Sequence, residues 1–154
     1  MLAFMRALGT WLAPVCLIVG LAPSALASDD ARVVSVGGSV TEIVYALGAE
    51  ERLVGVDSTS LYPPAAQEVP DVGYMRRLSA EPILSLEPDI VLAAADAGPP
   101  EALAQLRAAG VEVVEVPDTP SPAGVTEKVR AVAAALGMAG QGEALAKGSG
   151  GLRR

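Results

Sequence analysis

The run RVVSVGGSVTEIVYALG at residues 32–48 decides the fold class of this chain. Residues 32–36 form a β-branched stretch that predicts a strand, and Gly37-Gly38 ends it. Ser39-Val40-Thr41-Glu42 then has the S-x-x-E spacing of a capping box, which predicts that a helix begins at Ser39. Apolar residues follow at helical spacing up to Gly48, a residue typical of helix ends. The sequence therefore predicts a strand, a tight turn and a helix in direct succession.

The same alternation continues along the chain to residue 136. Further strands are predicted at 53–56, 90–93 and 111–116, and further helices at 80–85, 99–110 and 125–136. The last helix is indicated by the helical spacing of four apolar residues, which we expect to share one face: Val125, Val129, Val132 and Leu136. Four strands separated by helices predict an α/β fold with a mostly parallel four-stranded sheet flanked by helices.

Binding sites in sheets of this kind lie beyond the carboxyl ends of the strands. Three short segments occupy such positions here: 37–39, 57–60 and 95–98. The glycines of the first could cradle a phosphate, but the G-x-G-x-x-G and P-loop fingerprints are absent, so we favour a simple strand-to-helix turn. Asp57 and Ser58 have no histidine to activate a nucleophile, and turn chemistry accounts for them. We therefore expect a protein that is not an enzyme.

The first 27 residues have the pattern of a signal peptide. Arg6 precedes an apolar run, and Ala25-Leu26-Ala27 is an A-x-A cleavage site. A membrane anchor is the alternative, but the run is short for a spanning helix and Pro14 interrupts it. We therefore expect export to the periplasm and no transmembrane segment after cleavage. The only cysteine, Cys16, lies in this leader, so the mature domain must depend on its hydrophobic core.

Charge and composition exclude several classes of partner. The chain has 11 basic and 18 acidic residues and a formal net charge of −7. A nucleic-acid partner needs a basic face, and so does adhesion to anionic lipid. We therefore expect no binding to nucleic acid.

The segment GYMRRLSAE at residues 73–81 carries the candidate site. Tyr74, Arg76, Arg77 and Glu81 have no evident structural duty there. A phenolate beside a cation is a known type of haem-iron ligand. The alternative is that Tyr74 makes only a half-buried amphipathic contact, as tyrosines in loops often do.

The run from Arg32 to Leu92 resembles the N-terminal lobe of the haem-binding periplasmic proteins of bacterial ABC importers. These belong to a wider class that binds cobalamin and siderophores, and the resemblance continues through residues 96–121. The wider class shares the YPP turn at 62–64 and the EPDIVL strand at 87–92. DSTS at 57–60 and GYMRRLSAE point to the haem branch.

This resemblance implies two Rossmann-like lobes joined by a long helix, with the ligand between them. It implies that Tyr74 coordinates the haem iron and that Arg76 hydrogen-bonds the phenol oxygen. Arg77 could bind a haem propionate, because a planar guanidinium suits a carboxylate. Glu81 matches a glutamate that docks on the permease, which acts with an ATPase; the alternative is a solvated charge favourable to the helix dipole. Cobalamin and a ferric siderophore remain alternative ligands.

The resemblance also divides the chain into parts. We expect a signal peptide at 1–27, the N-terminal lobe at 28–138, and the start of the inter-lobe helix with a flexible tail at 139–154. A helical pattern begins at 141–147, and the glycines at 148–151 are expected to end it. The expectation is therefore a truncated chain without its second lobe, for which weak ligand binding and a nonfunctional fragment are both open.

Overall fold

The computed structural model describes residues 30–150, so the predicted signal peptide and Cys16 lie outside the described residues. These residues form one α/β lobe around a four-stranded sheet of strand order β2-β1-β3-β4, in which every pair is parallel. The strands are β1 (Val33–Val36), β2 (Leu53–Val56), β3 (Ile90–Ala94) and β4 (Glu112–Val116). The predicted fold class and all four predicted strands are confirmed.

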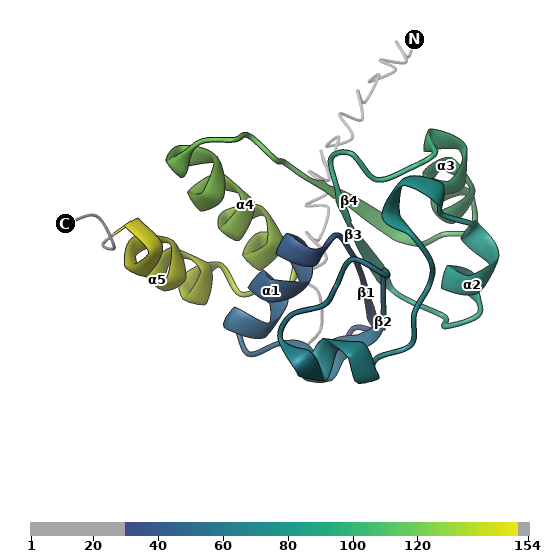
Figure 1. The fold of residues 1–154 in the computed structure, drawn as a ribbon, viewed down its shortest axis with the longest axis horizontal. Coiled ribbons are helices and arrows are strands. Elements are labelled where there is room, and N and C mark those ends of the chain that lie inside the picture. Colours follow the sequence, from purple (N-terminus) through teal and green to yellow (C-terminus); the bar gives the residue numbers. More distant parts are fainter. Residues whose placement is uncertain (1–29, 151–154) are drawn as a thin grey trace, which may run out of the picture.

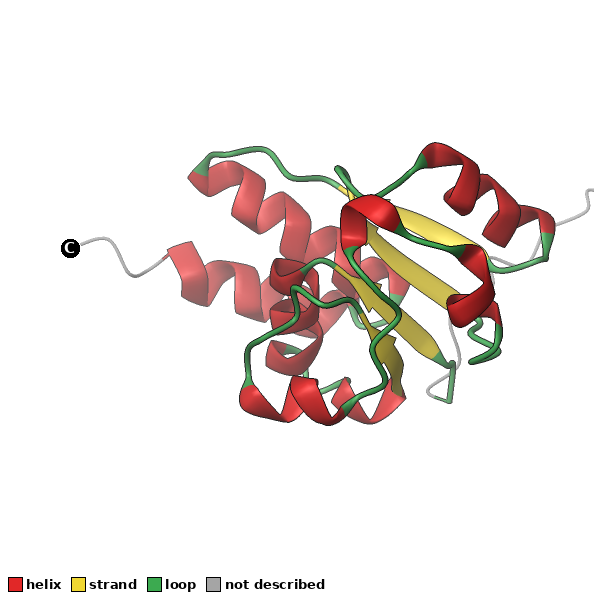
Figure 2. Cartoon of the chain, turned by 45° about the vertical axis from the view of Figure 1, so that its right-hand side comes forward, coloured by secondary structure: helices red, strands yellow, loops and turns green. Residues whose placement is uncertain are grey.

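Helices cover both faces of the sheet (Figure 1, Figure 2). One face carries α1 (Gly38–Ala46), α4 (Pro122–Ala135) and α5 (Ala139–Gly150), and the other carries α2 (Ala80–Leu84) and α3 (Pro100–Ala108). Three short 3-10 turns complete the structure: η1 (Glu50–Arg52), η2 (Pro64–Glu68) and η3 (Met75–Arg77). Between residues 30 and 150, no helix is both long and apolar enough to cross a membrane.

The central strands β1 and β3 are buried on both sides, and their side chains alternate between two hydrophobic clusters. Val33 and Leu92 pack toward α1 and α4, whereas Val34 and Val91 pack toward α2 and α3. This period of two is the geometry of a strand, and burial on both faces explains why these two strands read as apolar runs.

The predicted capping box at Ser39 is wrong. Helix α1 begins at Gly38, its N-cap is Gly37, and no side chain within the turn caps it. Gly37 has a φ of 112°, and a Cβ there would lie 2.9 Å from the Cβ of Ala94, so both conformation and space require glycine. The turn is therefore tighter than the sequence pattern suggested, and the helix starts one residue earlier.

Two expectations about the last helices also differ from the structure. On α4, Val129, Val132 and Leu136 are buried as predicted, but Val125 is 50% exposed because it lies in the first turn, beyond the edge of the core. Helix α5 runs to Gly150, past the glycine at 148 that was expected to end it. It packs closely on α4, since a Cβ at Gly142 would lie 2.3 Å from the Cβ of Ala133. At Gly142, tertiary packing thus outweighs the low helix propensity of glycine.

Two valines on α4 provide a matched test of this core. Val132 is 0% exposed and Val125 is 50% exposed. Val132→Ala should lower the free energy of unfolding by about 2 kcal/mol, because it removes buried methyl groups and leaves a cavity. Val125→Ala should change it by less than about 0.5 kcal/mol. Urea unfolding followed by circular dichroism measures both, and equal losses would contradict the placement of this helix.

Candidate functional site

The turn after β2 is built around the buried carboxylate of Asp57. Its Oδ1 accepts hydrogen bonds from the backbone N–H of Gly37 at 2.8 Å and from the hydroxyl of Ser60 at 2.9 Å. Its Oδ2 accepts from the backbone N–H and the hydroxyl of Thr59, at 3.0 and 2.8 Å. The Thr59 hydroxyl in turn accepts from the N–H of Gly38 at 3.1 Å. The N–H groups of Gly37, the N-cap, and of Gly38, the first residue of α1, are therefore occupied by this turn, which confirms a structural role for Asp57.

A chain of hydroxyls extends this network into the sheet. The Thr41 hydroxyl on α1 lies 2.8 Å from that of Ser35 on β1 and 2.7 Å from that of Ser60. All three side chains are buried. The carboxyl ends of β1 and β2 are thus joined through side chains as well as through the sheet.

The segment that carries the candidate site is fixed by backbone hydrogen bonds at both ends. Ser58 donates its N–H to the carbonyl of Gly73 at 3.0 Å. Gly98, on the connection after β3, donates to the carbonyl of Met75 and accepts from the N–H of Leu78, both at 2.9 Å. Residues 73–78 therefore lie between the carboxyl ends of β2 and β3, where α/β folds place their sites.

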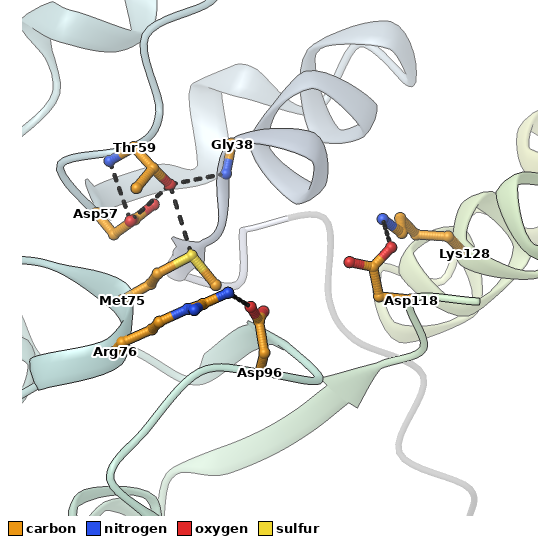
Figure 3. A network of polar contacts seen from close by, with 8 residues as sticks. All are labelled: Gly38, Asp57, Thr59, Met75, Arg76, Asp96, Asp118 and Lys128. Carbon is orange, nitrogen blue, oxygen red and sulfur yellow. Dashed lines mark hydrogen bonds and ion pairs between the residues drawn. The ribbon is translucent and has the colours of Figure 1, made fainter. Parts of the chain in front are cut away.

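Some side chains of this segment are buried and others are exposed. Leu78 is buried, and Met75 packs against both hydrophobic clusters, with its sulfur 3.8 Å from the Thr59 hydroxyl (Figure 3). Tyr74, in contrast, is 45% exposed, and Arg76 and Arg77 are exposed too. Met75 and Leu78 thus anchor a turn that presents the phenol and both guanidinium groups to solvent.

Arg76 pairs with an aspartate that the sequence did not connect to it. Its Nη2 donates to Oδ2 of Asp96, on the connection between β3 and α3, at 2.5 Å (Figure 3). The hydrogen bond and the charge of Asp96 raise the pKa of Arg76, and the charge of Tyr74 adds to this effect. Within residues 30–150, Arg76 bonds Asp96 and makes no hydrogen bond to the phenol oxygen of Tyr74. That role of Arg76 therefore stays a prediction.

Arg77 and Glu81 differ from Arg76 in having no partner of this kind. Within the described part of the chain, neither side chain has a recorded hydrogen bond or ion pair, and both are exposed. Arg77 remains free to meet an anion from solvent. Glu81 lies in the first turn of α2, so its solvated-charge interpretation and its docking interpretation both stay open.

A second ion pair lies on the same face and was missed in the sequence. Lys128 on α4 donates to Oδ1 of Asp118, which follows β4, at 2.6 Å (Figure 3). It also donates to the hydroxyl of Ser39 at 3.0 Å. Both Asp96 and Asp118 follow the carboxyl end of a strand, which is the one sequence signal that could have selected them. Their partners come from distant segments, and no local pattern identifies such pairs.

Comparison with known proteins places this face in context. Residues 33–149 match the family model described as periplasmic binding protein. The chain superimposes on the periplasmic heme-binding protein RhuT from Roseiflexus sp. RS-1 with a TM-score of 0.74 and 51% identity, over 77% of this chain and 45% of that one. For the periplasmic heme-binding protein BhuT in complex with two hemes, the TM-score is 0.73 and the identity 46%, over 76% and 45% of the two chains.

A relative with a different ligand also matches. The vitamin B12-binding protein of Vibrio cholerae serotype O1 is 36% identical over 102 residues, which is 65% of this chain and 37% of that protein. The chain therefore spans less than half the length of each of these three relatives.

The Asp57 network should be sensitive to the loss of one acceptor. In Asp57→Asn, an amide nitrogen replaces one oxygen and faces donors on either side, so we expect a loss of about 2–3 kcal/mol in the free energy of unfolding. Asp71→Asn is a suitable control, because Asp71 is exposed and accepts only from the N–H of Gly73, at 2.7 Å. Chemical denaturation measures both variants. If Asp57→Asn were as stable as the parent, the hydrogen bonds of this carboxylate would not be important for the stability of the fold.

Proposed function

Because this chain belongs to the periplasmic binding protein family, we propose that it is part of the haem receptor of an ABC importer and binds ferric haem through the phenolate of Tyr74. One observation carries the proposal. Tyr74 is exposed on a turn fixed between the carboxyl ends of β2 and β3, with two arginines two and three positions after it.

The chemistry of the site suits iron that arrives already held by a porphyrin. Among the described residues, no group of three or more histidine, cysteine or acidic side chains could hold a metal ion. Haem needs less from the protein, since the porphyrin nitrogens occupy the equatorial positions and tyrosinate is a known axial ligand. A single exposed phenol oxygen is therefore sufficient for attachment.

The two arginines would serve different parts of the ligand. Arg76 lies two residues after Tyr74, and its guanidinium would hydrogen-bond the phenol oxygen that binds ferric iron. Arg77 has no recorded partner in the described residues and could form a bidentate contact with a propionate. This division follows from the contact that Arg76 already makes with Asp96.

Similarity to known proteins supports haem more than cobalamin. RhuT and BhuT, whose names describe heme-binding proteins, are 51% and 46% identical to this chain, against 36% for the vitamin B12-binding protein. That relative keeps cobalamin as the second candidate ligand. Titration with cyanocobalamin beside ferric haem separates the two.

The described residues would form one lobe of a two-lobe receptor. This chain covers 45% of the length of RhuT, as one lobe and the start of a linking helix would. In that arrangement, residues 28–138 are the N-terminal lobe and α5 begins the connection. The signal peptide at 1–27 would direct the protein to the periplasm, where binding and delivery rather than catalysis are its task. Processing at Ala27 can be checked by N-terminal sequencing of the exported protein.

The first test of this function is the iron ligand. Ferric haem added to the chain should give the spectrum of tyrosinate-bound high-spin iron, and Tyr74→Ala should abolish it. Tyr62→Phe is the matched control, because Tyr62 is also an exposed loop tyrosine but precedes the proline-rich turn. In the same titration, Arg77→Ala should weaken haem retention and leave the spectrum unchanged.

Two outcomes would contradict this assignment. If Tyr74→Ala kept the tyrosinate spectrum, another residue would be the ligand. If the parent chain bound cyanocobalamin but gave no tyrosinate spectrum with haem, cobalamin would replace haem as the proposed ligand.

The second test concerns Glu81 and the permease. We propose that this exposed carboxylate docks on basic residues of the importer, so Glu81→Arg should weaken co-sedimentation with importer proteoliposomes by at least about tenfold. Glu101→Arg makes the same charge change in the first turn of the neighbouring helix α3 and serves as the control. Haem binding should be unchanged in both. Equal weakening by the two variants would indicate a general charge effect and no docking role for Glu81.

A further inference from the structure

Deepening the proposed function, on which it rests, we propose that Asp96 is a positioning residue that competes with the ligand for Arg76 and so limits the affinity of the site for an anionic ligand. The observation is the contact between Arg76 and Asp96 (Figure 3), in which Arg76 comes from the turn that follows Tyr74. Asp96 would thus act through Arg76, without itself touching the haem iron.

The backbone brings this pair together. Asp96 lies in a turn closed by the N–H of Ala97, which donates to the carbonyl of Ala94 at 2.8 Å. Two residues later, Gly98 is bonded to the carbonyl of Met75, the residue before Arg76. The loop that carries the carboxylate and the turn that carries the guanidinium are therefore fixed to one another, so their contact follows from the fold.

The contact is nevertheless one that a ligand can displace. The side chains of Arg76 and Asp96 are 62% and 43% exposed, and ion pairs with such exposure are weak because water screens both charges. A phenolate at Tyr74 or a ligand carboxylate offers the same guanidinium an equivalent acceptor. While Arg76 donates to Asp96, the same N–H group cannot donate to the ligand.

The negative charge of Asp96 also repels an arriving propionate directly. Because water screens this exposed carboxylate, the repulsion is weaker than the competition for Arg76. Tyr74 is the other group whose charge acts on Arg76. Asp57 is buried with both oxygens hydrogen-bonded within its own turn, so Asp96 is the exposed acid in contact with Arg76.

The second ion pair of this face supplies a matched control. Asp118 also follows the carboxyl end of a strand and also neutralises a cation, but that cation is Lys128 on α4. Asp118→Asn therefore changes the net charge of the face by the same amount as Asp96→Asn and leaves Arg76 paired.

The experiment measures haem affinity in these variants. Asp96→Asn should bind ferric haem about two- to fivefold more tightly than the parent. Asp118→Asn should match the parent. In an Arg76→Ala background, Asp96→Asn should lose most of its effect, because the competition acts through the guanidinium. An unchanged affinity in Asp96→Asn, an equal change in Asp118→Asn, or a full effect in the Arg76→Ala background would overturn the proposal.

A second readout separates this inference from the proposed function. Metal-free protoporphyrin IX carries the same propionates as haem but has no iron for Tyr74 to bind. Asp96→Asn should bind it about two- to fivefold more tightly than the parent, and Asp118→Asn should not. Tighter porphyrin binding without any tyrosinate–haem spectrum would refute haem as the ligand and keep the role of Asp96. The haem spectrum with unchanged affinities in Asp96→Asn would refute the role of Asp96 alone.

Discussion

The carboxylate of Asp57 is the point at which the elements of the binding face meet. It holds the first N–H of the turn into α1, closes its own turn at the end of β2, and positions Thr59 against Met75. Met75 in turn anchors the exposed segment that carries Tyr74. A buried carboxylate with four hydrogen bonds is costly to leave unsatisfied. The turn into α1 and the turn after β2 are therefore held together by Asp57. The position of the segment that carries Tyr74 thus depends on a residue that is itself buried.

This arrangement changes where an anion can bind on the fold. Many α/β proteins bind anionic groups at the N-terminus of the helix after β1, where free N–H groups and the helix dipole converge. Here Asp57 and Thr59 occupy the N–H groups of Gly37 and Gly38 from within the protein. In the proposed function, recognition of an anionic ligand would then depend on side chains from the next connection, where Arg77 makes no hydrogen bond or ion pair within the described residues. The proposed shift from backbone to arginine recognition suits propionates, which a guanidinium binds in a fixed orientation.

The parts of this structure that the sequence predicted are those with local causes. Strands buried on both faces read as apolar runs, and Gly48 and Gly110 end their helices where expected. The start of α1 was missed because its first N–H groups are satisfied by Asp57 and Thr59, in the turn after β2, in place of the predicted Ser39. The resemblance to haem-binding proteins selected Tyr74, Arg76, Arg77 and Glu81, but Asp96 as the partner of Arg76 could not be read from a separation of 20 residues. Such pairs depend on how loops from separate strands converge, and sequence periodicity carries no information about that.

The ion pairs of Arg76 and Lys128 also bear on how readily a ligand could be released in the proposed function. A receptor that holds its ligand through every available cation binds tightly but releases slowly, because affinity differences between related complexes appear mainly in the rate of dissociation. Two of the cations here, Arg76 and Lys128, are already paired with aspartates from the ends of β3 and β4. In the proposed function, a ligand that binds Arg76 would leave Asp96 unpaired beside it. Asp96 could then pair with Arg76 again as the ligand leaves, and this would assist dissociation. In the proposed cycle, attachment would then depend on the iron–phenolate bond, and the exchangeable ion pair would keep that attachment reversible enough for transfer to the permease.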